Sequence, residues 1–549
     1  MRSSKTRYFV WLPLWIAIGV AVGIVIGNIY SIFSPVAKTN IFGGNSNKLD
    51  AVIQYVNESY VDSVNTQELI EMTIPSLISE LDPHSSYISA KDMALVGDDL
   101  EGHFSGIGVQ FVLRNDTVMV VSVIPGGPSQ AAGIRPGDRI AFVNDTAYTG
   151  KAMSNEKVMR SLRGPKGSDV KLGIKRFGTP DIVNIMVKRG DIPVNTVDIS
   201  YTPADKVGLI KINKFGSTTY QEFISAISKL KKQGCDSFII DLRQNTGGYM
   251  NAAIEMINEF LERGQLIVYT EGRTIPREDA YANGSGTSKK DQLVVLIDEG
   301  SASASEIFAG AIQDNDRGLI IGRRSFGKGL VQNQQKFKDG SALRLTIARY
   351  YTPAGRSIQK PYEMGKSSDY NKDLMNRFLR GEFDSQDSIK QENEPLFQTI
   401  GGRPVHGNGG IMPDIFIPRD TVGVNSYYIT MRNEGLIYES AFLYTDKNRD
   451  RLEKFENWQE LDKYLSTQPL IQNLISLANS KGVRYRPYLV NDARKLLTTD
   501  MKANIIRNIF GDEGFYPIYL QDDIVVKKAI ELIQQKKASP EIISSQGYK

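Results

Sequence analysis

Apolar residues in the middle of the chain alternate between short runs and stretches with helical spacing. The mostly apolar runs 207–212, 237–242, 293–297 and 319–321 have the length and composition of buried strands. Between the first two, residues 218–230 repeat apolar positions every three or four residues, as an amphipathic helix does. This alternating order of strands and helices predicts an α/β core.

A second apolar pattern lies at the N-terminus. Residues 8–35 carry no charge and follow a basic segment at residues 2–7. The apolar part, residues 9–32, is long enough to cross a bilayer as a helix. Because the basic segment precedes it and the next basic residue is Lys38, the pattern places the N-terminus in the cytoplasm.

This stretch allows two interpretations. A cleaved signal peptide could end near Ala21-Val22-Gly23, where small residues flank one position. The apolar run continues well past that point, which favours a retained anchor over residues 8–33. We therefore expect a single-pass protein of the inner (cytoplasmic) membrane, with a cytoplasmic tail at residues 1–7 and the remainder in the periplasm or cell exterior.

Changes in composition divide the rest of the chain. Glycine and asparagine mark a linker over residues 34–47, and helical spacing predicts an N-terminal helical segment over residues 48–100. Residues 365–393 are polar and charged, which indicates an exposed insertion. Residues 421–549 have helical spacing without motifs, and packing, dimerisation or partner docking are all open as their role.

Composition narrows the function classes. The 549 residues suggest several domains, and 41% hydrophobic with 23% charged residues is ordinary for globular proteins. Sixty-six basic residues against 62 acidic residues give no indication of a nucleic-acid partner. The one cysteine, Cys235, cannot form an intrachain disulfide. Three histidines leave little material for a Ser-His-Asp triad, so a lysine base is the more plausible partner for a serine.

The candidate chemistry lies in residues 291–332. After the run 293–297, an acidic turn leads into S-A-S-A-S-E, where a helix should begin. A serine at a helix start lies beside free N–H groups that can hold an oxyanion. Further on, Lys328 stands between two glycines, and a buried lysine there can lose its proton and act as a base. The sequence alone does not decide among Ser301, Ser303 and Ser305.

The runs S-A-S-A-S-E and F-G-K-G-L-V-Q together resemble the family of C-terminal processing (tail-specific) serine proteases. The resemblance covers roughly residues 50–420 and implies a crotonase-like protease core over residues 191–420. It implies that Ser303 is the nucleophile, Lys328 the general base and Gln332 the residue that orients the lysine. No metal or cofactor is implied.

The same resemblance implies the oxyanion donors. The run D-L-R-Q-N-T-G-G follows a predicted strand and opens a helix, so its N–H groups should point outward. In the family one donor comes from the glycine pair of this run, here Gly247 or Gly248. The other is the N–H after the nucleophile, here Ala304.

Residues 101–190 look like a PDZ domain of the bacterial protease type. The glycine loop S-G-I-G-V, followed by P-G-G-P and G-I-R-P-G-D-R-I, carries this resemblance. It implies that the loop Gly106-Ile107-Gly108-Val109 binds the carboxylate of a substrate tail while the neighbouring strand edge pairs with the peptide. Arg163 matches a residue that in some members links the PDZ position to the active site, although a solvated charged turn is an equal alternative.

Three other readings compete with this one. G-R-R-S-F-G-K has the spacing of a phosphate-binding P-loop, but Gly329 stands where that motif needs Ser or Thr, and an extended run follows. A Ser-His-Asp hydrolase would need a G-x-S-x-G elbow, and Ser303 lies in A-S-A. A catalytically silent, membrane-tethered PDZ scaffold or adaptor would need a broken Ser-Lys pair.

The sequence therefore predicts an α/β (α+β) multidomain chain with an N-terminal transmembrane helix, a PDZ domain inserted before the protease core and a helical C-terminal region. The predicted function is a membrane-anchored serine endopeptidase that cleaves proteins at or near their C-termini with a Ser-Lys dyad. The expected partners are protein tails and the membrane, while a homo-oligomer or an adaptor protein is left open.

Overall fold

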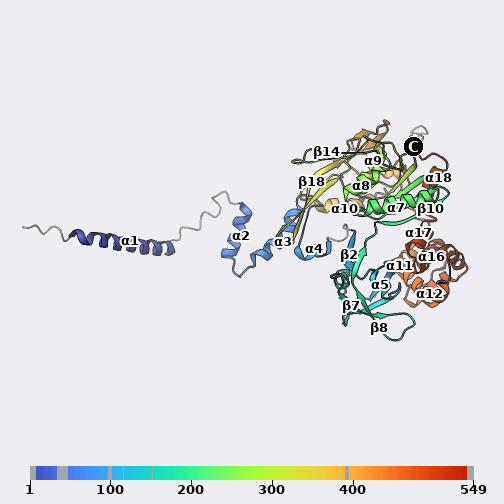
Figure 1. The fold of residues 1–549 in the computed structure, drawn as a ribbon, viewed down its shortest axis with the longest axis horizontal. Helices are drawn as coiled ribbons and strands as arrows, with labels where there is room; N and C mark the ends of the chain where they lie inside the picture. Colours follow the sequence, from blue (N-terminus) through green and yellow to red (C-terminus); the bar gives the residue numbers. More distant parts are fainter. Residues whose placement is uncertain are drawn as a thin grey trace, which may run out of the picture. The chain divides into compact units, whose positions relative to one another are not determined.

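The computed structural model describes residues 8–33, 47–96, 102–114, 117–150, 153–389 and 395–540. It divides into two compact units, Met1–Leu77 and Ile78–Lys549 (Figure 1). The predicted cytoplasmic tail, and the predicted linker except for Asn47, lie outside the described residues.

The first unit is helical. It holds α1 (Tyr8–Phe33), α2 (Lys48–Ser59) and most of α3 (Thr66–Ser79). A helix therefore forms over the predicted anchor, and its large apolar side chains between Leu14 and Ile26 are exposed. Within the described ranges, however, no helix combines the length and the apolarity that crossing a bilayer requires. The membrane anchor remains a prediction from the sequence.

The PDZ region folds around its own core. One sheet has the order β3-β4-β5-β7-β8, with β6 beside β5, and a separate pair joins β2 to β9. These strands are β2 (His103–Gly106), β3 (Val109–Arg114), β4 (Thr117–Val123), β5 (Arg139–Val143), β6 (Thr146–Ala147), β7 (Asp169–Lys175), β8 (Val183–Lys188) and β9 (Gly190–Pro193), with helices α5 (Pro128–Ala131) and α6 (Asn155–Leu162). Because β3 ends this sheet, no other strand of the described residues pairs with its outer edge.

The protease region is built on a six-stranded sheet of order β10-β11-β12-β15-β16-β21. β10 is antiparallel to β11, and every following pair is parallel. The strands are β10 (Val197–Ala204), β11 (Val207–Ile212), β12 (Ser237–Asp241), β15 (Gln292–Ile297), β16 (Leu319–Gly322) and β21 (Ile415–Phe416). The predicted alternation of buried strands and helices is therefore present.

Alternate residues of these strands face two different helical layers, as the two-residue period of a strand requires. Phe238 and Ile240 point into a core shared with α7 (Thr219–Lys232), α8 (Met250–Asn258) and α9 (Ala304–Asp314). Ile239, between them, packs into a second core with α18 (Ile524–Gln534). The last described helix, α18, thus covers one face of the sheet, which the sequence did not indicate.

An antiparallel sheet of order β1-β18-β13-β14 adjoins the core, and β17 pairs along the opposite edge of β18. Its strands are β1 (Ser86–Ile88), β13 (Leu266–Glu271), β14 (Glu278–Tyr281), β17 (Leu330–Lys336) and β18 (Ala342–Tyr351), and α4 (Ala90–Val96) follows β1. Residues 48–100 are therefore not a purely helical segment, because β1 pairs with β18. The strand β17 directly after Lys328 also contradicts the helix that a P-loop would need.

The described part of the predicted exposed insertion at residues 365–393, which ends at residue 389, is mostly exposed or half-buried, with a few buried side chains. It contains α10 (Ser367–Leu379), followed after a turn by η1 (Gln386–Ser388), and the short pair β19 (Leu396–Gln398) and β20 (Pro404–His406) comes after it. Arg377 is fully buried and donates to Glu382, which also pairs with Arg324 of the core at 2.7 Å. Pairing with opposite charges allows these few charged side chains to be buried within an otherwise largely exposed segment.

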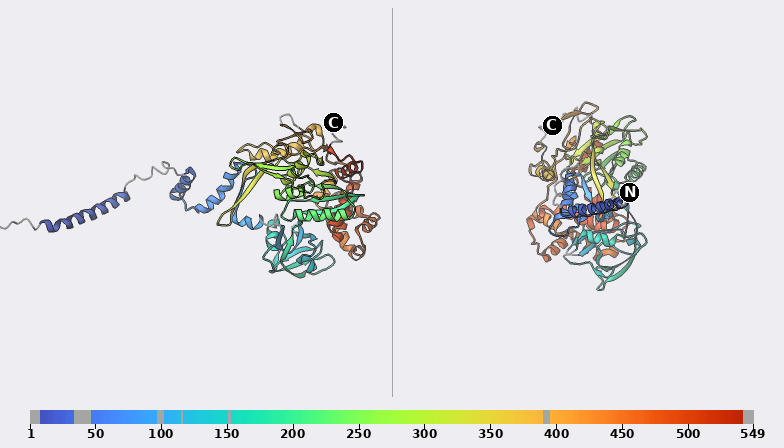
Figure 2. Two further views of the ribbon diagram at one scale, coloured as in Figure 1. Left: turned by 45° about the horizontal axis from the view of Figure 1, so that its top comes forward. Right: turned by 90° about the vertical axis from the view of Figure 1, so that its left-hand side faces the viewer.

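The C-terminal helices form a fourth core and also contact the PDZ region. They are α11 (Ser426–Asn433), α12 (Leu436–Leu452), α13 (Trp458–Leu465), α14 (Leu470–Ser480), α15 (Pro487–Asp492), α16 (Arg494–Phe510) and α17 (Asp512–Leu520). On α12, Phe442 packs against Met119 and Val121 of β4, and Arg449 donates to Pro136 O at 3.2 Å. Figures 1 and 2 show these orange and red helices beside the PDZ strands.

Candidate active site

Ser303 lies where β15 turns into α9. It is the N-cap residue of α9 and has a φ of 55°, a left-handed conformation that is unusual for a residue with a side chain. Its N–H donates to Glu306 Oε2 at 2.9 Å. A strained backbone held in place by its surroundings is typical of functional sites, and here it brings Ser303 to the wall of a cavity of about 500 Å³.

The two neighbouring serines are held by the main chain. Ser301 Oγ donates to Leu242 O at 2.8 Å and Ser305 Oγ donates to Asn245 O at 2.9 Å, and both residues are fully buried. Neither lines the cavity, whereas Ser303 does. The structure thus separates three serines that the sequence left equivalent.

Lys328 lines the same cavity, on the segment between β16 and β17. Its Nζ lies 3.4 Å from Gln332 Oε1, to which it donates. Burial lowers the pKa of Lys328, and the charge of Arg344 lowers it further, while Glu306 and Asp82 act in the opposite direction. This environment favours the neutral amine more than water does.

Glu306 ties the serine loop to the lysine loop. Its two carboxyl oxygens accept from Ser303 N, Ser325 Oγ, Gly327 N and Lys328 N at 2.5 to 2.9 Å. Burial raises the pKa of Glu306 to about 7, against the effect of these hydrogen bonds. The sequence motifs assigned no role to Glu306, although Ser303-x-x-Glu306 is the pattern of a helix capping box.

Gln332 bridges Lys328 to a distant segment of the chain. Its Nε2 donates to His84 O. The His84 ring hydrogen-bonds Tyr370 at 2.8 Å, and burial with the nearby charge of Lys328 lowers its pKa to about 4. Asp82 accepts from Ser85 and His84 and fixes this turn. With its pKa lowered and its hydrogen bond to Tyr370, the ring of His84 is a neutral structural group.

The glycine pair packs against the serine loop. A Cβ on Gly247 would lie 2.7 Å from Ala302 O, and one on Gly248 would lie 2.0 Å from Phe215 O, so neither position has room for a side chain. Gly247 N donates to Asn245 Oδ1 at 2.9 Å, and Gly248 lines the cavity. Ala304, in the first turn of α9, follows Ser303 directly. Gly248 is thus better placed than Gly247 to donate into the cavity.

Tyr350 is a second residue that the sequence analysis missed. It lies on β18, is buried, lines the cavity and donates its hydroxyl to Lys328 O. This hydrogen bond fixes the backbone that carries the lysine. The sequence around Tyr350 does not indicate this contact, because it is the pairing of β17 with β18 that brings the tyrosine to Lys328.

The predicted carboxylate-binding loop of the PDZ region connects β2 to the edge strand β3. Gly108 has a φ of 77°, Ile107 is buried, and Gly108 O accepts from Ile124 N at 3.0 Å. Arg163, at the end of α6, lies over the ring of Phe104 at 4.5 Å. This contact stays within the PDZ region, and the predicted coupling to the active site remains untested.

Comparisons with known proteins agree with this architecture. Residues 206–371 match the model of peptidase family S41, residues 105–188 match the PDZ domain model, and residues 427–511 match a family of unknown function. A probable CtpA-like serine protease of Staphylococcus aureus (strain N315) is 36% identical over 316 residues, and one of Staphylococcus haemolyticus is 36% identical over 313 residues. Each match covers 57% of this chain and 62% of the relative, so the chain spans less than two thirds of these relatives.

Among solved structures, the photosystem II D1 C-terminal processing protease is similar to this chain. It is 29% identical, with a TM-score of 0.33 over 56% of this chain and 88% of that one. The family resemblance predicted from the serine and lysine motifs is confirmed by the family models and the curated relatives.

Proposed function

Since the chain belongs to the family of C-terminal processing serine proteases, we propose that it is a serine endopeptidase that cuts proteins at or near their C-termini. One observation carries this proposal. Ser303 and Lys328 line the same cavity, and Glu306 accepts from the backbone N–H groups of both.

The proposed reaction begins with proton transfer. Neutral Lys328 takes the hydroxyl proton of Ser303 as the oxygen attacks the substrate carbonyl. The N–H groups of Ala304 and Gly248 hold the oxyanion of the tetrahedral intermediate. Lys328 then gives its proton to the leaving amine, and water hydrolyses the acyl-enzyme. Gln332, which accepts from Nζ, keeps the lysine directed toward the cavity.

The direct test compares cells that make the natural chain with cells that make the Ser303→Ala variant. Mass spectrometry of protein C-termini should find proteins whose tails keep additional residues in the variant strain. Those proteins are the substrates. Identical tails in both strains would contradict a processing peptidase and favour the silent scaffold.

Substrate capture by the PDZ region is the second part of the proposal. Its support is the glycine loop beside the edge strand β3, where a tail can add as an extra strand. A Cβ at Gly108 would lie 2.9 Å from Ile192 at a positive φ, so Gly108→Ala should distort the loop. We expect KM for a protein substrate to rise about tenfold, a loss of about 1.4 kcal/mol in binding, with a smaller change in kcat.

Gly126→Ala is the matched control, because Gly126 also has a positive φ, 72°, but has open space around it. Amidation of the substrate's C-terminus should raise KM for the natural chain and add little to the Gly108→Ala defect. An equal KM for free and amidated tails in the natural chain would argue against capture by the PDZ region.

Membrane anchoring through residues 8–33, and a catalytic unit in the periplasm or cell exterior, are supported only by the charge-free sequence and the exposed apolar side chains. Carbonate extraction of membranes decides the anchor, because an anchored chain stays in the pellet. Release into the supernatant would exclude a retained transmembrane helix.

A further inference from the structure

The charged side chains that line the active-site cavity are all basic among the residues that the structure describes. Lys328, Lys336 and Arg344 line it, together with polar and apolar residues and without an aspartate or glutamate. The carboxylates that act on Lys328, Glu306 and Asp82, are buried and accept hydrogen bonds from their own neighbours. The cavity therefore has an excess of positive charge that no carboxylate in its described lining offsets.

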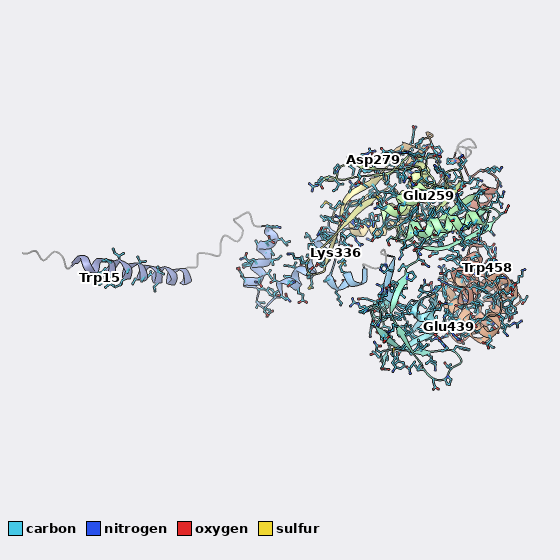
Figure 3. The ribbon with its side chains drawn as sticks, in the orientation of Figure 1. Trp15, Glu259, Asp279, Lys336, Glu439 and Trp458 are labelled. Carbon is cyan, nitrogen blue, oxygen red and sulfur yellow. The ribbon has the colours of Figure 1, made fainter. Side chains whose placement is uncertain are left out.

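Two of these cations lie along one face of the hairpin formed by β17 and β18. Side chains two residues apart on a strand share a face, and Gln332, Gln334 and Lys336 all line the cavity. Arg344 lies opposite Gln334 in the register and donates to its Oε1 at 3.0 Å. Figure 3 shows Lys336 on this hairpin.

The rise per residue of β17 gives the distance of each position along the strand from Gln332, beside the reaction centre. At about 3.3 Å per residue, Gln334 lies about 7 Å and Lys336 about 13 Å beyond Gln332, which contacts the catalytic lysine. An extended substrate has the same rise per residue. Arg344 and Lys336 therefore reach substrate positions about two to four residues from the bond that is cut.

We infer that Arg344 and Lys336 select substrates that carry a carboxylate about two to four residues from the scissile bond. The inference rests on the proposed peptidase function and adds a substrate class to it. The carboxylate can belong to an acidic side chain or to the free end of the substrate chain, since both present the same charged group to the two cations.

The test uses peptide pairs that differ only by Glu or Gln at one of these positions. The measured quantity is the ratio of kcat/KM within each pair, in which any effect of a variant on the lysine base cancels. We expect the natural chain to favour Glu about two- to fivefold, as partly exposed ion pairs do. In the double variant Arg344→Gln with Lys336→Gln the ratio should fall close to one.

Two further variants sharpen the result. Lys338→Gln removes an exposed cation two residues from Lys336 that does not line the cavity, so it should leave the ratio unchanged. Arg344→Glu should reverse the preference toward a Lys-containing peptide. A ratio of one at every position in the natural chain, or an unchanged ratio in the double variant, would overturn the inference.

A second arm identifies the source of the carboxylate. Peptides that end two to four residues after the cut are compared as free acids and as amides. If the preference for the free acid disappears in the double variant, the two cations bind the carboxylate at the end of the substrate chain. If it disappears only with Gly108→Ala, the PDZ loop binds that carboxylate, and this result counts against the chain end as the ligand of the two cations.

The failure of the peptidase proposal is a separate outcome. If no peptide is cut, binding of the same pairs to the Ser303→Ala chain, followed by fluorescence anisotropy, still decides the inference. Tighter binding of the Glu peptide that depends on Arg344 and Lys336 supports it, and equal binding refutes it.

Discussion

Ser303→Ala should abolish cleavage, with kcat reduced by at least about 10⁴-fold. The hydroxyl is the proposed nucleophile, and a methyl group cannot form the acyl-enzyme. The fold should persist, because the Ser303 N–H donates to Glu306 from the main chain and remains in the variant. The measurement is turnover of a protein substrate by the purified chain, together with its thermal unfolding.

The neighbouring serines are the matched controls. Ser301→Ala and Ser305→Ala each remove a buried hydroxyl that donates to a main-chain oxygen, Leu242 O or Asn245 O. We expect each to lower the free energy of unfolding by about 1–3 kcal/mol while the folded protein keeps its activity. A loss equal to that of Ser303→Ala in either control, with the fold intact, would mean that the nucleophile is misassigned.

The serine loop shows how far sequence reasoning reaches. The apolar run before it and the helical spacing after it predict the strand, the turn and the helix, and all three are present. The choice among three serines depends on a φ of 55° at Ser303 and on acceptors from the loop after β12. Neither the backbone angle nor these acceptors can be deduced from the local sequence. The pattern could therefore locate the site but could not identify which serine faces the cavity.

The parts that the sequence missed depend on contacts between distant segments. Glu306 joins residues near 303 and near 327, and Gln332 reaches His84 across 248 positions. The charged stretch that holds Arg377 is largely exposed, as its composition predicts, but composition does not show that Arg377 itself is buried and paired with Glu382. Similarly, the apolar face of α18 predicts burial but not its partner, the protease sheet.

Lys328→Met should remove activity almost as completely as loss of the serine, because methionine has a similar length but cannot accept a proton. In the natural chain only the neutral amine is the base. Activity should therefore rise with pH through the pKa of Lys328 and be lost on acidification below it. The ordinary pKa of a lysine side chain is about 10.4. Since burial and the charge of Arg344 lower the pKa of Lys328, the activity should rise at a pH below that value.

The variant Arg344→Gln tests the direction in which the charge of Arg344 shifts the pKa of Lys328. Removing the arginine charge makes protonated Lys328 more favourable, so its pKa increases and the rising limb of the kcat/KM profile moves to higher pH. Glu306, with a pKa of about 7, titrates nearby, and the limb reports the coupled pair. A limb that stays in place, or moves to lower pH, would contradict Lys328 as the general base.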